Sequence, residues 1–120
     1  MINYCVVIPL YNKEEYLVAC IESVLVQTYQ PRQIVIVNDG STDCSLEIAK
    51  DFAAQVDKIC VIDQPNAGVS VARNKGYQTV DTEWVAFLDA DDTWASDFSE
   101  AALSLLNVCP KALMLGFGHT

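Results

Sequence analysis

Two hydrophobic periods alternate along the chain. Near-continuous runs of Val, Ile and Leu, as in strands that are buried on both faces, occur at residues 5–10, 33–38, 59–63 and 84–88, with a weaker run at 112–117. Apolar residues at helical spacing lie between them, at residues 17–25, 46–56, 69–80 and 98–106. Strands that alternate with helices favour right-handed crossovers and a parallel sheet. We therefore expect an α/β fold, a mainly parallel sheet with helices on both faces, as one domain over residues 1–120.

Polar residues at the expected helix starts predict helix caps. Asn12 with Glu15, and Asp97 with Glu100, have the three-residue spacing of a capping box. The cluster 41–43, Ser-Thr-Asp, precedes the second helical stripe. We expect these side chains to cap the first, fourth and second helices respectively.

Composition and charge narrow the class of protein. The 120 residues are 52% hydrophobic and 19% charged, which is typical of one globular domain and excludes collagen, low-complexity disorder and a coiled coil. The formal net charge of −9 would repel a phosphate backbone, so a general nucleic-acid binder is excluded. A small anionic ligand requires local donors or a metal ion to neutralise it.

The cysteines and the N-terminus bear on location. Five cysteines without a CxxC pair give no zinc site and no disulfide framework. Cys5, Cys20 and Cys60 lie inside apolar runs, where we expect buried, reduced thiols. No basic region precedes the first apolar run, and no run reaches the roughly eighteen residues of a membrane span. We expect a cytoplasmic chain, free or held at the inner face of the membrane as part of a full-length protein.

Polar residues follow the strands at the edge where parallel sheets bind ligands. They occupy residues 9–12, 38–43, 63–68 and 89–92. Asp89, Asp91 and Asp92 stand closest together, and carboxylates that crowd in this way destabilise the fold unless a cation neutralises them. Mg²⁺ or Mn²⁺ would suit such oxygen ligands, and a solvated acidic turn is the alternative.

Three further residues at this edge each allow two interpretations. Asp39 would form an Asx turn or helix cap, or would accept a hydrogen bond from a ligand. Tyr11 would stack on a base or cover the core. Arg73 would clamp a diphosphate or pair with the acidic edge.

Four segments, in this order, resemble a known family: VVIPLYNKEEYLVACIESVLVQTY, IVIVNDGSTD, NAGVSVARNKG and WVAFLDADDTW. Together they are similar to the N-terminal, nucleotide-sugar-binding half of the family 2 glycosyltransferases, which have the Rossmann-like GT-A fold. The resemblance covers nearly the whole chain. Each segment alone is weak evidence for the family, but four segments at the expected strand ends and in the expected order are specific evidence for it.

The resemblance implies a set of nucleotide-binding positions, which are Pro9, Leu10, Tyr11, Glu15, Asp39, Arg73, Asp89 and Ala90. By analogy Asp39 accepts a hydrogen bond from the uracil or guanine imide, and Asp89 reaches the ribose side. Arg73 would lie near the nucleotide or its phosphates. Some related enzymes have Glu four residues after the proline, where this chain has Lys13, and Glu15 would substitute for that contact.

The resemblance also implies a metal site and a reaction. Asp89 and Asp91 match the DXD motif, in which Asp91 would coordinate the Mg²⁺ or Mn²⁺ that bridges the two phosphates, with Asp92 as a second or outer-sphere ligand. The family transfers a sugar from a nucleotide-diphosphate donor to an acceptor hydroxyl by direct displacement. We expect a UDP-sugar donor, a glycan or lipid-linked acceptor, inversion at the anomeric carbon and a role in cell-surface polysaccharide biosynthesis.

Only the donor-binding half of that chemistry is visible in the sequence. We expect the acceptor base beyond Thr120, so the chain would be a truncated fragment or a short paralogue, and His119 would be exposed. A nucleotide-sugar-binding module without catalysis is the alternative. A dinucleotide-dependent oxidoreductase would need GxGxxG after the first strand, and a phosphoacceptor domain would carry its acidic pair there. This chain has Pro-Leu-Tyr-Asn at that point.

Overall fold

A central parallel sheet organises the molecule. The computed structural model describes residues 3–102 and 114–115. The strands are β1 (Tyr4–Leu10), β2 (Gln33–Asp39), β3 (Ile59–Gln64), β4 (Trp84–Phe87) and β5 (Met114–Leu115), and the helices are α1 (Leu17–Leu25), α2 (Ser45–Gln55) and α3 (Val69–Thr79). The strand order is β3-β2-β1-β4-β5, and every neighbouring pair is parallel. The expected α/β architecture is confirmed.

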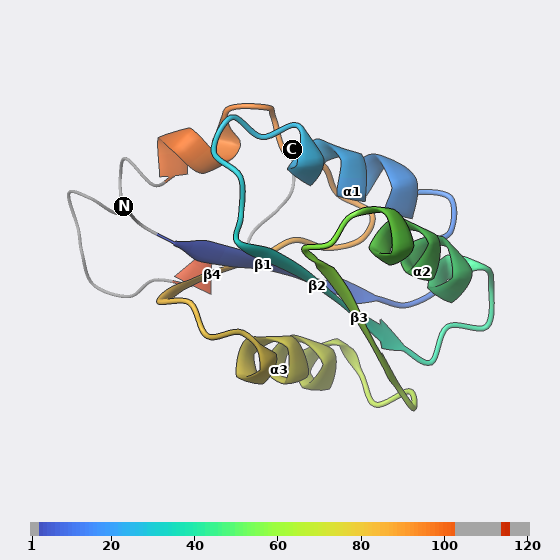
Figure 1. Ribbon diagram of the computed structural model, residues 1–120. Helices are drawn as coiled ribbons and strands as arrows, with labels where there is room; N and C mark the ends of the chain where they lie inside the picture. The colour runs from blue at the N-terminus through green and yellow to red at the C-terminus, as the bar shows by residue number, and fades with distance from the viewer. Residues whose placement is uncertain (1–2, 103–113, 116–120) are drawn as a thin grey trace.

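The helices cover both faces of this sheet. Figure 1 shows α1 and α2 above it and α3 below it. Alternate strand residues supply two cores: Val6 and Ile8 pack beneath α1 and α2, whereas Val7, Val35 and Val37 face α3. The central strand β1 is buried along its whole length, which explains its unbroken apolar run.

The last two expected elements are described only in part. Residues 98–102 are helical, and the rest of that expected helix, to residue 106, lies outside the described residues. The weak apolar run at 112–117 contributes β5, and its other residues are likewise outside the description. Cys109, His119 and Thr120 fall there too.

The predicted cap of the first helix is wrong. Helix α1 begins at Leu17, and Tyr16 at its N-cap makes no side-chain capping bond. Asn12 instead adopts a left-handed backbone conformation, with φ of 49°. Its side-chain Oδ1 accepts hydrogen bonds from the backbone amides of Thr42 at 2.7 Å and Asp43 at 3.3 Å. The side chain that was expected to cap α1 therefore joins two loops.

The N-cap position of the second helix lies one residue after the cluster 41–43, which was expected to cap it. Helix α2 begins at Ser45, with Cys44 at the N-cap position and no side-chain bond from it. Asp43 Oδ1 accepts a hydrogen bond from the Ser45 amide at 2.9 Å. Asp43 therefore satisfies one backbone donor at this helix start, as the sequence suggested.

The cysteines follow the prediction in two of three cases. Cys5 and Cys20 are buried and free. Burial is the largest cause that raises the pKa of each thiol. Cys60 was also expected to be buried, but it is only half-buried because β3 is the edge strand of the sheet. Among the described residues, no helix is long and apolar enough to cross a bilayer.

Candidate functional site

A cleft opens where the chain reverses direction along the sheet. The chain moves from β1 outward to β2 and β3, and then returns to the other side of β1 as β4. Such a switch point leaves a crevice outside the carboxyl ends of the strands, since the connections on its two sides run to opposite faces. The cleft has a volume of about 460 Å³. Its lining residues are Pro9, Leu10, Tyr11, Lys13, Asp39, Asn66, Gly68, Val69, Ala72, Arg73, Asp89, Ala90 and Asp91.

Most of the predicted nucleotide-binding residues meet in this cleft. Seven of the eight line it, from the ends of β1, β2 and β4 and from α3. Glu15 is exposed and is not among the lining residues, whereas Lys13 is. Tyr11 is 46% exposed at the cleft and does not cover the core.

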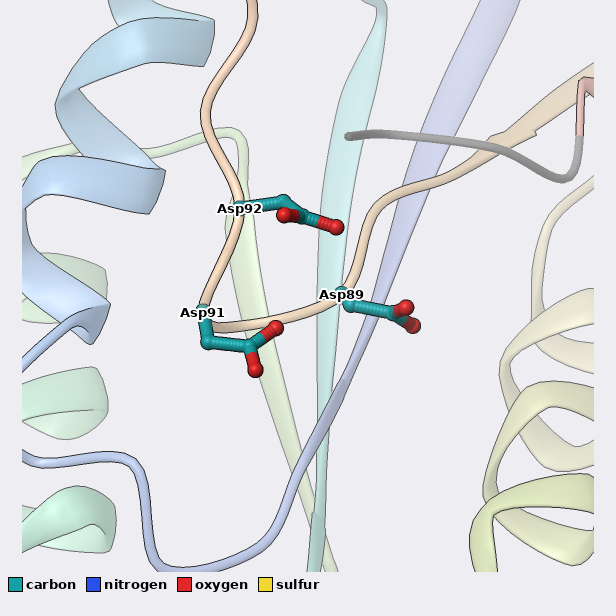
Figure 2. A group of neighbouring side chains, drawn as sticks. All are labelled: Asp89, Asp91 and Asp92. Carbon is teal, nitrogen blue, oxygen red and sulfur yellow. The ribbon is translucent and has the colours of Figure 1, made fainter. Parts of the chain in front are cut away.

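Three carboxylates gather on the loop after β4. Each of Asp89, Asp91 and Asp92 offers one oxygen, and these oxygens lie within 4.8 Å of one another. A tight turn brings them together, because the Asp92 amide donates to the Asp89 carbonyl at 3.0 Å. Figure 2 shows the three side chains on this turn, with their carboxyl groups pointing toward the right of the view. Hard oxygen donors in this arrangement fit Mg²⁺ or Mn²⁺.

Helix α1 fixes the loop that carries these carboxylates. Cys20 Sγ lies 3.5 Å from the Asp89 carbonyl oxygen, and Ser23 Oγ accepts a hydrogen bond from the Trp94 amide at 3.1 Å. Just after the end of this helix, Gln27 Nε2 donates to the Ala95 carbonyl at 2.6 Å. The acidic cluster is therefore held by the packed interior although its carboxylates are partly exposed.

Two cations flank the acidic cluster from opposite layers. Arg73 on α3 donates to Asp89 Oδ1 at 3.0 Å, which is the salt bridge that the sequence left as one alternative for this residue. Lys13, from the loop before α1, has its Nζ 3.7 Å from Asp91 Oδ2. The local charge therefore remains negative, since two cations face three carboxylates.

Asp39 is a buried anchor for the loop between β3 and α3. The residue is 4% exposed. Oδ1 accepts hydrogen bonds from the Ala67 amide at 2.7 Å and from Gln64 Nε2 at 2.9 Å. Oδ2 accepts from the Gly68 amide at 3.0 Å and from Asn66 Nδ2 at 3.4 Å. Both oxygens thus use their two lone-pair directions within the protein.

The pKa of Asp39 records this environment. Burial acts to raise the pKa of the carboxyl, and the hydrogen bonds from Gln64, Ala67 and Gly68 outweigh it, so that the pKa lies below its ordinary value of 3.8. The carboxylate also faces the start of α3, because Gly68 is its N-cap residue. Neither an Asx turn nor a cap of α2 describes Asp39, because its partners come from the next crossover.

The loops after β1 and β2 are tied together beside the cleft. Backbone amides of the first loop donate to side chains of the second: Asn12 to Ser41 Oγ at 3.0 Å, Lys13 to Ser45 Oγ at 2.9 Å and Glu14 to Asp43 Oδ2 at 3.2 Å. Asn12 Oδ1 returns two bonds in the opposite direction. The positions of Tyr11 and Lys13 are therefore fixed relative to β2.

Five residues that line the cleft were not among the predicted site residues: Lys13, Asn66, Gly68, Val69 and Ala72. Asn66 holds Asp39, and its only signal was its place among polar residues after the third strand. Lys13 stands where some related enzymes have Glu, and for this reason Glu15 was expected to make the contact in its place. A residue that lies four positions after Pro9 can still point into the cleft when the chain turns left-handed at Asn12.

Comparison with known proteins agrees with this geometry. The sequence model of glycosyl transferase family 2 matches residues 5–117. Glycosyltransferase GlyA of Streptococcus pneumoniae serotype 4 is 46% identical over 95 residues, which are 79% of this chain and 14% of that protein. The teichoic acid poly(glycerol phosphate) polymerase of Staphylococcus epidermidis is 42% identical over 93 residues, which are 76% of this chain and 13% of that protein.

Solved structures share the fold. TarS residues 1–349 of S. aureus, in complex with UDP-GlcNAc, superimposes with a TM-score of 0.79 at 26% identity, over 89% of this chain and 32% of that chain. The mannosyltransferase PcManGT of Pyrobaculum calidifontis, in complex with GDP-Man and Mn²⁺, gives a TM-score of 0.79 at 24% identity, over 87% and 32%. This chain thus spans about a third of each solved structure and a smaller part of the two sequence relatives. The chain belongs to glycosyl transferase family 2.

Proposed function

We propose that this chain forms the donor-binding part of a glycosyltransferase that transfers a sugar from a nucleoside-diphosphate donor, a UDP-sugar, to an acceptor hydroxyl. The observation that carries the proposal is the cleft itself, with an apolar and aromatic wall from β1 and a cluster of three carboxylates at its β4 side. The relative named as a teichoic acid poly(glycerol phosphate) polymerase supports a role in cell-surface polysaccharide synthesis. Buried free thiols favour a reducing, cytoplasmic location.

The two sides of the cleft suit the two ends of a nucleotide. Strands β2 and β4 flank β1, so their ends are separated by two strand spacings, about 10 Å. In a nucleoside diphosphate, the base and the diphosphate are a similar distance apart. Tyr11 offers a ring face for the base near Asp39, and Arg73 offers a guanidinium for phosphate oxygens near Asp89.

The base contact of Asp39 requires an exchange of hydrogen bonds. All its lone-pair directions are used, so an imide N–H must replace one existing donor. The Asn66 amide makes the longest of these bonds, at 3.4 Å to Oδ2, and it is the donor that gives way most easily. Asp39 would then recognise the base while it still holds the Ala67 and Gly68 amides.

The acidic cluster would hold a divalent cation through Asp91, with Asp89 and Asp92 beside it. Bound Mg²⁺ or Mn²⁺ stabilises the negative charge on a departing nucleoside diphosphate. Asp89 would orient the ribose, and Arg73 would contact the phosphates after it leaves Asp89. The base that activates the acceptor hydroxyl would lie in those parts of the longer relatives that this chain does not match.

Calorimetry with UDP and GDP tests the proposal. With Mn²⁺ present we expect saturable binding of at least one of them, and in EDTA we expect binding to weaken at least about tenfold. Asp91→Ala should remove the metal dependence, and Asp92→Ala should weaken it less. Asp51→Ala, the same substitution at an exposed position on α2, is the matched control. Absence of nucleotide binding in Mn²⁺, or equal binding in EDTA, contradicts the proposal.

A further inference from the structure

Lys13 has a fixed backbone and a movable side chain. Its amide donates to Ser45 Oγ at 2.9 Å, and its carbonyl accepts from the amides of Tyr16 at 3.0 Å and Leu17 at 2.9 Å. The side chain, 40% exposed, lines the cleft. A lysine carries its charge on a flexible four-carbon stem, so the ammonium group can reach more than one partner from this single anchor point.

The present partner of Lys13 is held loosely. The Nζ to Asp91 Oδ2 distance of 3.7 Å is that of an ion pair and too long for a hydrogen bond, and the Asp91 side chain is 44% exposed. Pairs of this kind contribute little to stability because water screens them. Arg73, by contrast, is hydrogen-bonded to Asp89 at 3.0 Å. Of these two ion pairs, that of Lys13 is the easier to exchange.

Charge makes such an exchange favourable when a donor binds. A divalent cation that enters at Asp91 competes with the ammonium group of Lys13 for the same carboxylate. A diphosphate brought by that cation offers the displaced ammonium a new anionic partner. The ammonium group of Lys13 then has an anionic partner at both stages.

We propose that Lys13 is a diphosphate ligand that alternates between two partners: Asp91 in the empty cleft, and the donor diphosphate once a divalent cation occupies the acidic cluster. This inference rests on the proposed function and assigns to it a residue that the comparison of motifs set aside. If the proposal is right, removal of the Lys13 ammonium group must change the affinities for a cation and for a diphosphate in opposite directions. Loss of the ammonium should make the carboxylates more available to a cation and the cleft less attractive to a diphosphate.

Calorimetry of Lys13→Gln with three probes tests these two opposite effects on cation affinity and diphosphate affinity. Mn²⁺ alone should bind about two- to threefold more tightly than to the wild-type chain. UDP or GDP with saturating Mn²⁺ should bind about tenfold more weakly, and the matching nucleoside without phosphates should bind unchanged. Lys13→Arg should restore nucleotide binding to within about threefold, because it retains the charge. Lys50→Gln, the same charge change at an exposed position on α2, should alter none of the three.

The outcomes separate this inference from the proposed function. If the wild-type chain binds UDP or GDP with Mn²⁺ but Lys13→Gln leaves that affinity unchanged, the inference is overturned and the proposed function stands. Equal weakening of nucleoside and diphosphate binding also overturns it, because that pattern reports a distorted cleft. If the wild-type chain binds neither nucleotide, the proposed function fails and the inference fails with it. Thermal unfolding of each variant verifies that the fold is intact.

Discussion

Asp39→Asn should destabilise the fold through a mismatch that no rotation of the new side chain can relieve. The Ala67 amide donates to Oδ1 and the Gly68 amide to Oδ2, at 2.7 Å and 3.0 Å. Asparagine has one acceptor oxygen and one amino group, so in either orientation one backbone N–H faces the amino group. At 4% exposure, water does not readily replace the lost acceptor.

The cost follows from these contacts. A hydrogen bond to a charged group contributes about 1.5 to 3 kcal/mol, and a carboxylate at a helix start adds about 0.3 to 1 kcal/mol, so we expect a loss of about 2 to 4 kcal/mol in the free energy of unfolding. For a domain of this size each kcal/mol lowers Tm by about 3 to 6 °C. The loop 66–68 lines the cleft in part, so nucleotide affinity should fall as well.

Urea unfolding, followed by circular dichroism, measures this loss. Asp51→Asn makes the same chemical change at an exposed site on α2 and should alter the free energy of unfolding by less than about 0.5 kcal/mol. If Asp39→Asn were as mild as Asp51→Asn, Asp39 would not anchor the loop. Reduced nucleotide affinity with unchanged stability would assign Asp39 to the base alone.

Two further predictions concern acid pH and the packing of α3. Since the folded pKa of Asp39 lies below 3.8, its contribution is present above about pH 4 and is lost as the pH falls through the folded pKa; urea unfolding from about pH 6 to pH 3 should show a steeper loss in the wild-type chain than in Asp39→Asn. A Cβ on Gly76 would lie 2.4 Å from Val7 Cγ1, so Gly76→Ala should cost about 1 to 2 kcal/mol net of its better helix propensity. Val7→Ala in the same chain should relieve this clash, and a double-mutant cycle measures the coupling.

The sheet could be predicted from sequence because burial on both faces leaves a strong signal. A central parallel strand such as β1 has no polar face, so its apolar run is nearly continuous. The same argument located the cleft, since the carboxyl ends of parallel strands meet at one edge. Cys60 shows the limit of predicting burial from an apolar run. Such a run has the same pattern in a central strand and in an edge strand, and β3 is half-covered because the strand order places it at the edge.

The contacts inside the site depend on partners far along the chain. The spacing of Asn12 and Glu15 satisfies a local capping rule, but the Asn12 side chain bonds to Thr42, 30 residues away. The partners of Asp39 are 25 to 29 residues away, so neighbouring residues could not reveal them. The pairing of Arg73 with Asp89 was one of two expected alternatives, and sequence gave no means to choose between them.

Aspartates at equivalent strand ends acquire different roles from their surroundings. Asp39 ends β2 beneath the β3–α3 loop, where amide donors surround it, so its negative charge is satisfied within the protein and its main effect is to shape the cleft. Asp89 and Asp91 follow β4 on a turn that no neighbouring amides enclose in the described contacts, so their charge is balanced only by one arginine and one loosely held lysine. Negative charge that the protein balances incompletely attracts a cation. We therefore expect the cation at the side of the cleft where the fold supplies fewer hydrogen-bond donors than carboxylate oxygens.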